Sequence, residues 1–363
     1  MKILFILENY YPNIGGVETL FKNLAEKLNQ DGYEILVLTH KSQKNLAAIE
    51  VINGVQVRRL PLRNRFVFTF FSLPWVLYYG RRFDYFHTTS YNAAVPAFIA
   101  AKLLNKKCFI TFHEYWGKLW FQLPHLNLVT RFLFYWYEKI ISKFSYHKII
   151  AVSESTSQSL VSNGVNKDRV IVIYNGIDYA QFNSFEHKAP ASFFTFTYFG
   201  RIGISKGVNI LLEASNQFLK TNSGSILKLI VPLKPKGKLN RIKKFVRENN
   251  LTNNVIFLHQ LSDEQVKSDL CNSSCVIIPS YSEGFCFAAA EVIAMKIPLI
   301  SSDKTALKEV VSGSYIKMEE LNVTCLVDSL KKASANKWHI SPVKFFHLDQ
   351  CIDRYKDLYT QAK

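Results

Sequence analysis

Short apolar runs alternate with helix-like segments along the whole chain. In the first half, runs typical of buried strands occupy residues 3–7, 35–39, 55–60, 85–88, 108–112, 149–152 and 170–174. In the second half, similar runs occupy residues 193–199, 226–231, 255–258, 275–278 and 298–303. Alternation of strands and helices predicts parallel β-α-β units. We therefore expect an α/β protein built from two such series.

A polar segment at residues 183–191, which contains Pro190, separates the two series and predicts an interdomain linker. We expect one domain over residues 1–182 and a second over 192–342. A terminal segment over 343–363 follows, and its residues 349–362 have the pattern of an amphipathic helix.

Composition supports two globular domains and argues against several other classes. The chain has 363 residues, of which 48% are hydrophobic and 20% charged, so two cores can form and disorder is not indicated. The first apolar run ends at Glu8 without a cleavage site, and the longest, 66–79, is too short to span a bilayer. Six scattered cysteines make no zinc pattern and indicate free thiols, so we expect a cytoplasmic location and no metal.

The charge balance points to an anionic partner. There are 45 Lys and Arg residues against 28 Asp and Glu residues, a formal net charge of +17. Such an excess favours nucleotide phosphates, an acidic bilayer surface or nucleic acid. It is spread over both halves of the sequence, so no single basic tail explains it.

Two glutamates eight positions apart mark the most informative stretch. Glu283 lies in a predicted loop after a buried strand, and Glu291 lies in the first turns of the alanine-rich helix that follows. The two carboxylates can therefore contact different parts of one ligand. Flexible Gly284 beside a helix N-terminus offers backbone N–H groups to phosphate, which indicates a sugar nucleotide. Taken alone, such a pair is more often a plain strand-loop-helix with two surface glutamates.

Basic and glycine-rich loops follow other predicted strands. Arg201 and Lys206 are five positions apart in a glycine-bearing loop, so both can contact one diphosphate. Gly15 and Gly16 precede a predicted helix and permit close approach of the backbone to a ligand. His113 directly follows the strand at 108–112, where an imidazole can donate to a sugar hydroxyl or balance charge.

These motifs, in this order, closely resemble those of retaining glycosyltransferases of family 4, also called glycosyl transferases group 1. The likeness rests on Gly15-Gly16, the N-G-I-D turn at Asn175, the G-R-x4-K-G loop, the E-x7-E pair and Glu309, and it spans residues 1 to about 311. It implies the GT-B fold: two Rossmann-like domains facing across a cleft, with a C-terminal helix that crosses back to the first domain. Cys286 and Lys296 stand where the family has glycine, and Thr305-Ala306 replaces a glycine pair of the family.

The resemblance also implies roles for the site residues. Arg201 and Lys206 would hold the diphosphate, and Glu291 would accept hydrogen bonds from the ribose. Glu283 and the backbone near Gly284, Phe285 and Cys286 would position the sugar. In the first domain, Gly15 and Gly16 would contact phosphate and His113 would line the reaction centre. Asn175 would lie in the turn at the end of that domain. No metal or other cofactor is expected, and Glu283, His113, Arg201 and Lys206 are the catalytic candidates.

The expected reaction moves a hexose or N-acetylhexosamine from a nucleotide sugar, with a UDP-sugar favoured over GDP-mannose. The acceptor would be a saccharide or lipid-linked saccharide in bacterial lipopolysaccharide, capsule or other surface polysaccharide synthesis.

Aromatic segments at 66–79 and 116–146 are interleaved with basic residues and either contact an anionic membrane or cover the sheet. The first of these segments is flanked by six arginines: Arg58, Arg59, Arg63, Arg65, Arg81 and Arg82. The alternatives are a sugar-nucleotide epimerase of the same fold and a non-catalytic sugar-nucleotide- or RNA-binding protein, although no nucleic-acid motif is present.

Overall fold

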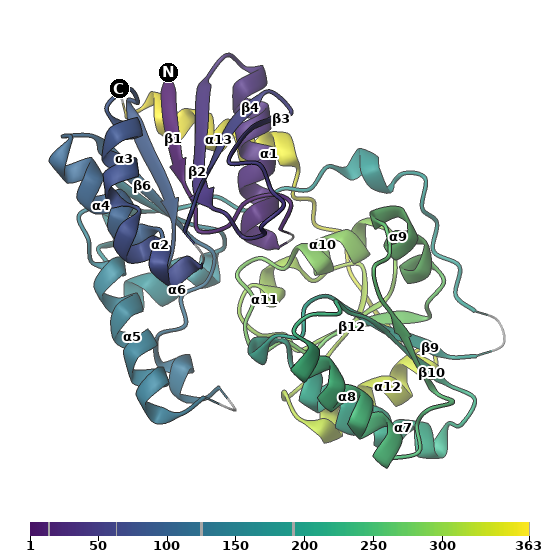
Figure 1. The fold of residues 1–363 in the computed structure, drawn as a ribbon. Helices are drawn as coiled ribbons and strands as arrows, with labels where there is room; N and C mark the ends of the chain where they lie inside the picture. The colour runs from purple at the N-terminus through teal and green to yellow at the C-terminus, as the bar shows by residue number, and fades with distance from the viewer. Residues whose placement is uncertain (14, 63, 124–125, 191–192, 363) are drawn as a thin grey trace. The chain divides into compact units, whose positions relative to one another are not determined.

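The chain forms two compact units (Figure 1). In this computed structural model, residues 1–13, 15–62, 64–123, 126–190 and 193–362 are described. The first unit comprises residues 1–122, 126–176 and 348–363, and the second comprises 123–125 and 177–347. The segment predicted as a linker, 183–191, falls among the residues of the second unit, and its last residue, Ala191, lies outside the described residues.

A sheet of eight described strands forms the centre of the first unit. Its order is β3-β4-β2-β1-β5-β6-β7-β8, and every neighbouring pair is parallel except β3 with β4. The strands are β1 (Lys2–Ile6), β2 (Glu34–His40), β3 (Ile49–Ile52), β4 (Val55–Leu60), β5 (Tyr85–Thr89), β6 (Lys107–Phe112), β7 (Lys148–Ala151) and β8 (Val170–Val172). Buried Leu, Ile, Val and Phe side chains dominate the central strands, as expected for a parallel sheet covered on both faces.

Helices connect these strands and cover the sheet. They are α1 (Gly16–Gln30), α2 (Arg65–Phe71), α3 (Leu73–Gly80), α4 (Ala94–Leu103), α5 (Leu128–Ser142), α6 (Glu154–Ser162) and α13 (Leu348–Thr360), with short 3-10 turns η1 (Gly117–Phe121) and η2 (Lys167–Arg169). The apolar segment at 66–79 forms the two short helices α2 and α3. Asn64 caps α2 by accepting hydrogen bonds from two backbone N–H groups.

The C-terminal helix α13 belongs to the first unit and lies beside α1 (Figure 1). Tyr355 and Tyr359 of this helix are fully buried. The Tyr359 hydroxyl is hydrogen-bonded to Nδ1 of His87, whose Nε2 lies 2.8 Å from the Thr111 hydroxyl. The helix therefore returns to the first unit, as the sequence resemblance implied, and His87 serves to anchor it.

A second sheet, of seven described strands, forms the centre of the second unit. Its order is β11-β10-β9-β12-β13-β14-β15, with only the last pair antiparallel. The strands are β9 (Thr195–Phe199), β10 (Ile226–Ile230), β11 (Val255–Leu258), β12 (Cys275–Ile278), β13 (Leu299–Ser301), β14 (Ser314–Lys317) and β15 (His339–Ile340). The helical elements are η3 (Tyr179–Phe182), η4 (Ile204–Lys206), α7 (Val208–Thr221), α8 (Lys236–Glu248), α9 (Asp263–Cys271), α10 (Phe287–Ala294), α11 (Leu307–Val310) and α12 (Val323–Ser334).

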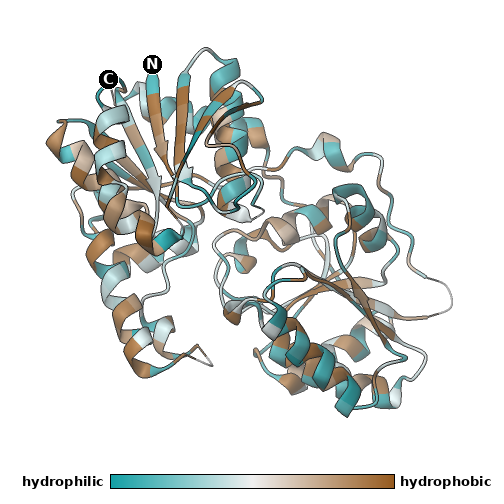
Figure 2. Ribbon diagram, in the orientation of Figure 1, coloured by the Kyte–Doolittle hydropathy of each residue, from teal (hydrophilic) through white to brown (hydrophobic). Residues whose placement is uncertain are grey.

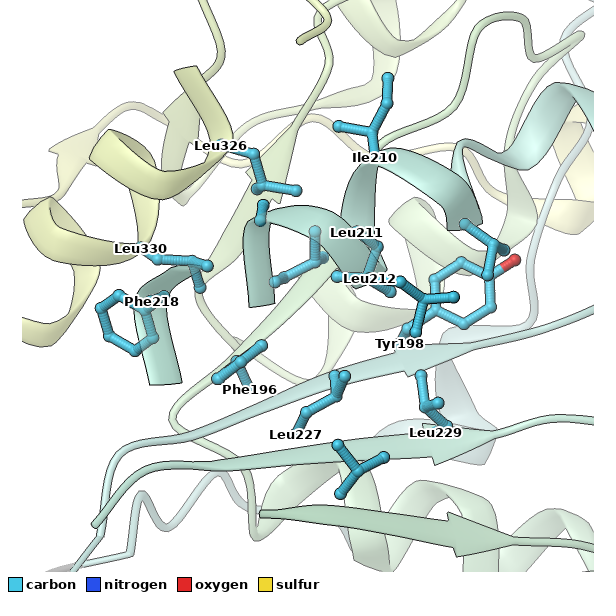
Figure 3. Packing of buried hydrophobic residues seen from close by; sticks show 14 of the residues in the cluster. Phe196, Tyr198, Ile210, Leu211, Leu212, Phe218, Leu227, Leu229, Leu326 and Leu330 are labelled. Carbon is cyan, nitrogen blue, oxygen red and sulfur yellow. The ribbon is translucent and has the colours of Figure 1, made fainter. Parts of the chain in front are cut away.

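The core of the second unit lies between its sheet and the helices α7 and α12 (Figure 3). Leu211 and Phe218 of α7 meet Phe196 of β9, and Leu326 and Leu330 of α12 close the layer. Apolar side chains concentrate in the strands, whereas the lysine-rich α8 is mostly hydrophilic (Figure 2). Each predicted strand is present with small shifts at its ends, and the α/β class is confirmed.

Candidate active site

The order of strands in the second unit reverses between β9 and β12. From β9 the chain proceeds outward to β10 and β11, and from β12 it proceeds in the other direction to β13 and β14. Ligands of open α/β sheets bind at such a switch point, beyond the carboxyl ends of the strands. The loop after β9 carries Arg201 and Lys206, and the loop after β12 carries Glu283. Neighbouring strands thus place the basic and acidic motifs at one point.

The two loops approach each other closely at Gly207. Its φ is 66°, and an added Cβ would lie 1.8 Å from the backbone oxygen of Pro279. The backbone N–H of Tyr281 donates to the carbonyl of Ser205 at 2.7 Å. Only glycine fits at position 207 without moving the backbone.

Lys206 and Glu283 form an ion pair that links these loops. Nζ of Lys206 lies 2.7 and 2.8 Å from the two carboxylate oxygens, and the Ser280 hydroxyl donates to the same carboxylate at 2.7 Å. The Glu283 side chain is 8% exposed and the Lys206 side chain 26% exposed. Because Glu283 is nearly buried, its charge depends on these donors.

Thr305, in the loop before α11, fixes the backbone of Glu283. The N–H of Glu283 donates to the Thr305 hydroxyl at 2.8 Å, and that hydroxyl donates to the Glu283 carbonyl at 2.9 Å. In the sequence, Thr305 stands out only as a departure from the family pattern. That departure was also the available signal for its role, because threonine brings a hydroxyl group to a position where glycine has no side chain.

Three of the four positions where the family has glycine share one backbone property, and the fourth, Ala306, has an ordinary φ of -65°. Cys286, Lys296 and Thr305 have φ values of 75°, 58° and 47°. Positive φ is easily reached by glycine and strained for other residues. At these three positions the chain therefore has a backbone conformation that glycine would adopt more easily than the residues present. Burial also raises the pKa of the Cys286 thiol well above its usual range, so the thiol is neutral.

Glu291 lies on α10 in surroundings that differ from those of Glu283. Burial raises the pKa of Glu291 to about 7; the charge of Asp263 adds to this effect and that of Lys267 opposes it. Asp263 and Lys267 are themselves ion-paired at 2.7 Å. The two glutamates of the motif therefore do not share a proton or a partner, as the sequence spacing predicted.

Arg201 presents a solvent-exposed side chain beside this centre. The Tyr198 hydroxyl donates to the Arg201 carbonyl at 2.9 Å, and Lys238 donates to the Ile202 carbonyl at 3.1 Å, so the backbone is held. Within the described residues, no hydrogen bond or ion pair engages the guanidinium. Gly284 and Phe285 are buried in the adjoining loop, where the Phe285 ring contacts the Phe287 ring at 5.3 Å.

The remaining residues that the sequence resemblance singled out belong to the first unit. Gly15 is the N-cap of α1 and Gly16 its first residue, so both glycines stand at a helix N-terminus, as predicted. Ile14, which precedes them, lies outside the described residues. Asn175 is 2% exposed, and its Oδ1 has no hydrogen-bond partner in the described part of the chain. It lies next to Gly176, the residue at which this stretch of the first unit ends.

His113 follows β6 at the carboxyl edge of the first sheet. Burial lowers its pKa to about 3, so the imidazole is neutral at physiological pH. Its Nε2 is buried and has no hydrogen-bond partner among the described residues. A neutral imidazole with an unused nitrogen can accept or donate one hydrogen bond to a substrate hydroxyl.

Metal clusters and membrane-spanning helices are both absent from the described part of the chain. No group of three or more His, Cys, Asp or Glu side chains that could hold a metal ion occurs in the described residues. Across the same residues, no helix combines the length and hydropathy needed to cross a bilayer. Independence from metal remains a prediction.

Comparison with known proteins places both units in the same group of enzymes. The model of glycosyltransferase family 4 matches residues 14–181, and that of glycosyl transferases group 1 matches residues 180–339. A subunit of phosphatidylinositol N-acetylglucosaminyltransferase from Arabidopsis thaliana is 22% identical over 99% of this chain and 79% of its own length. A GDP-mannose:cellobiosyl-diphosphopolyprenol alpha-mannosyltransferase of Xanthomonas oryzae pv. oryzae is 26% identical over 83% of this chain and 78% of its own length.

Solved structures share the fold over nearly the whole chain. Sucrose-phosphate synthase from Thermosynechococcus elongatus superposes with a TM-score of 0.83 at 20% identity, covering 99% of this chain and 98% of that one. HepE of Anabaena in complex with UDP and glucose gives a TM-score of 0.74 at 17% identity, covering 99% of this chain and all of that one. The two family models, in order along one chain of the GT-B fold, show that this protein belongs to the glycosyltransferases of family 4 (group 1).

Proposed function

We propose that the protein transfers a hexose or N-acetylhexosamine from a nucleotide sugar to a saccharide or lipid-linked acceptor with retention of configuration. The observation that carries the proposal is the Lys206–Glu283 ion pair at the switch point between β9 and β12, next to exposed Arg201. A UDP-sugar is the favoured donor. In support, HepE was solved with UDP, while GDP-mannose, named in the Xanthomonas relative, is the next choice.

In this mechanism the second unit holds the donor. Arg201 and Lys206 contact the diphosphate and stabilise the charge that develops on it as the bond to the sugar breaks. Glu291 accepts hydrogen bonds from ribose hydroxyls, and Glu283 positions the sugar. The bond from the anomeric carbon to the phosphate oxygen breaks while a bond to the acceptor oxygen forms on the same face. The acceptor proton passes to the departing phosphate oxygen, so no protein nucleophile and no metal are required.

Thermal unfolding with UDP-, GDP-, ADP- and CMP-sugars tests donor binding. A ligand present at about 100 times its Kd raises the free energy of unfolding by roughly 2.7 kcal/mol. One nucleotide class should stabilise the wild type but neither Arg201→Ala nor Glu291→Ala. Stabilisation of all three proteins alike would contradict the assigned site. Transfer in the presence of EDTA tests independence from metal.

A lipid-linked acceptor fits both the relatives and the surface of the first unit. The two relatives described above act, by their names, on phosphatidylinositol and on a diphosphopolyprenol. Helix α5 contains many apolar residues, which appear as brown segments in Figure 2, and several of them form an exposed stripe. The α5 stripe consists of Leu128, Val129, Phe132, Leu133, Trp136 and Ile140, each between 43% and 73% exposed. Spacings of four residues place these side chains along one face of the helix.

The charges around the α5 stripe suit an anionic bilayer surface. The single acid of α5, Glu138, is fully buried and accepts hydrogen bonds from backbone and side-chain donors of the 116–120 segment. Lys139 lies 5.0 Å from the Trp136 ring centre. The face thus combines aromatic anchors with positive charge and no exposed acid.

One of the six arginines around segment 66–79 does not face solvent or a membrane, contrary to the expectation from the sequence. Arg59 is 4% exposed, forms an ion pair with Glu50 and donates to the Tyr11 carbonyl at 2.7 Å, so it stabilises a loop instead of facing a membrane. Arg63, another of these six arginines, lies outside the described residues.

Flotation with vesicles tests the membrane contact. Wild type should float with vesicles of phosphatidylglycerol and phosphatidylcholine at low salt, and Phe132→Ser/Trp136→Ser should not. The matched control, Ile340→Ser, removes an apolar side chain that is 70% exposed in the second unit and should leave flotation unchanged. If the wild type did not float at low salt, the membrane contact would be refuted and a soluble acceptor would be the preferred hypothesis.

An epimerase of the same fold would convert the donor with no acceptor present. Incubation of the stabilising nucleotide sugar with enzyme alone, followed by product chromatography, separates the two activities. A new sugar nucleotide would indicate epimerisation, and slow release of free sugar would indicate a transferase using water. A protein that binds without catalysis would show neither product with any acceptor.

A further inference from the structure

A basic pocket lies at the edge of the first sheet away from His113. Its volume is about 310 Å³, and its lining includes Lys102, Lys106, Lys107, His147 and Arg169 but no Asp or Glu. All of these residues belong to the first unit. We call this cavity the basic pocket.

The topology explains why so many basic residues meet there. Lys102 lies in the last turn of α4, Lys107 begins β6, His147 precedes β7, and Arg169 precedes β8. The last three mark the amino ends of neighbouring parallel strands, whereas His113 follows the carboxyl end of β6. Six residues of extended chain separate Lys107 from His113, which corresponds to roughly 20 Å. The basic pocket is therefore a separate site from the one that carries transfer.

Among the described residues, few negative charges compensate the positive charges of the pocket. Lys107 donates to the backbone carbonyl of Ala362, and Lys102 lies 5.7 Å from the Phe98 ring centre. Neither contact supplies a negative charge. Within the described residues, no carboxylate forms an ion pair with Lys106 or Arg169. In addition, the pKa of His147 is lowered by burial and by the charges of Lys107 and Lys148.

We propose that the basic pocket binds a phosphate-bearing anion. A phosphate group carries up to two negative charges and several acceptor oxygens, which match converging lysines and a planar guanidinium. The cavity has room for more than one phosphate. Two sources share this chemistry: a free phosphate ester in solution and the headgroup of an anionic lipid. Beside the pocket, Ile99 and Leu103 of α4 are 38% and 66% exposed, which suits a lipid.

The test uses pyrophosphate as the soluble probe and phosphatidic acid vesicles as the lipid probe. Both are applied to the Arg201→Ala protein, so that the second unit contributes less phosphate binding. The ring proton signals of His147, assigned by NMR with a His147→Gln variant, report pyrophosphate binding at this pocket. Co-sedimentation reports vesicle binding.

Lys106→Ser/Arg169→Ser should weaken binding of the effective probe by about tenfold or more, since two charge-assisted contacts are lost. The matched control, Lys220→Ser/Arg247→Ser, removes the same two charges from exposed positions in the second unit and should bind as before. A response to pyrophosphate alone identifies a free phosphate as the source, and a response to vesicles alone identifies a headgroup. No saturable response to either probe, or equal loss in both double variants, would overturn the proposal. Because the pyrophosphate arm needs neither donor nor membrane, its result is independent of the proposed transferase activity.

Discussion

The carboxylate of Glu283 is stabilised mainly by one ammonium group. Lys206→Met removes both Lys contacts, at 2.7 and 2.8 Å, and leaves a nearly buried charge with the Ser280 hydroxyl. We expect the free energy of unfolding to fall by roughly 2 kcal/mol, because an unpaired buried carboxylate is costly. Thermal or urea unfolding measures the change.

Glu283→Gln in the same background separates stability from function. The double variant Lys206→Met/Glu283→Gln has no buried charge at this point, so most of the lost stability should return. Transfer activity should stay absent, since the diphosphate contact is still missing. Recovery of activity together with stability would show that the pair is structural only.

Glu291 makes the site sensitive to pH near neutrality. Its pKa of about 7 lies above the ordinary carboxyl value, so its contribution to folding is present at low pH and is lost as the pH rises through 7. The Tm of the ligand-free wild type, relative to Glu291→Gln, should therefore decrease from pH 6 to pH 8. Donor affinity should change in the opposite direction, because the ionised form accepts ribose hydroxyls best. A Tm difference that is constant over this range would contradict the assignment.

Individual site residues were predictable where the signal lies within one short stretch of sequence. The sequence places Arg201, Lys206 and Glu283 in loops after strands, and the structure joins Lys206 with Glu283. Thr305 was not found as a partner of Glu283, because its contact spans 22 positions and depends on how neighbouring loops pack. No short-range pattern reports such a contact.

At the scale of elements, the junction of η4 and α7 depends on Gly207. Gly207→Ala adds a methyl group that would overlap the Pro279 carbonyl and also strains the positive φ. We expect the free energy of unfolding to fall by about 2 kcal/mol or more, with loss of donor binding because both loops move. Gly224→Ala is the control, since an added Cβ there meets nothing within 4 Å. Similar unfolding curves for both variants would contradict the close approach.

The strands that the sequence did not predict, β3, β14 and β15, are short and lie at a sheet edge or next to one. β3 exposes Ile49 and Val51 at 61% and 67%, so its pattern does not resemble a buried strand. The Asn53-Gly54 turn, with φ values of 48° and 86°, was the available signal for a hairpin with β4. β14 and β15 have four and two residues, too few for a periodic pattern.

At the scale of the whole molecule, the first unit is completed by a helix encoded at the end of the chain. Without α13, the surfaces that cover Ile352, Tyr355 and Tyr359 would be exposed to water. We expect a fragment of residues 1–176 to lack a cooperative thermal transition. The same fragment joined through a short Gly-Ser linker to residues 348–362 should regain it. The control carries Tyr355→Ala/Tyr359→Ala in the linked fragment and should remain unfolded; cooperative folding of 1–176 alone would contradict the expectation.

The two-domain α/β organisation was predictable because strand and helix patterns repeat along the chain. The division at Gly176 was less accessible from sequence. Polar composition at 183–191 indicated a linker, but Phe182 beside that segment and Phe185 within it lie 4.9 and 5.7 Å from Lys267 and pack into the second unit. Composition does not reveal such packing.

The long stretch of the second unit, residues 177–347, begins and ends at one place. The N–H of Ile177 donates to the Phe346 carbonyl at 2.8 Å, and Ile177 pairs in parallel with His347. In genetic terms, residues 177–347 are an insertion whose two ends are adjacent, so a single cassette carries all but residues 123–125 of the unit to which we assign donor binding. Exchanging that cassette with a relative requires two neighbouring junctions and leaves the sheet of the first unit intact. Under the proposed assignment, we expect such an exchange to change the transferred sugar and to leave the residues of the first unit unaltered.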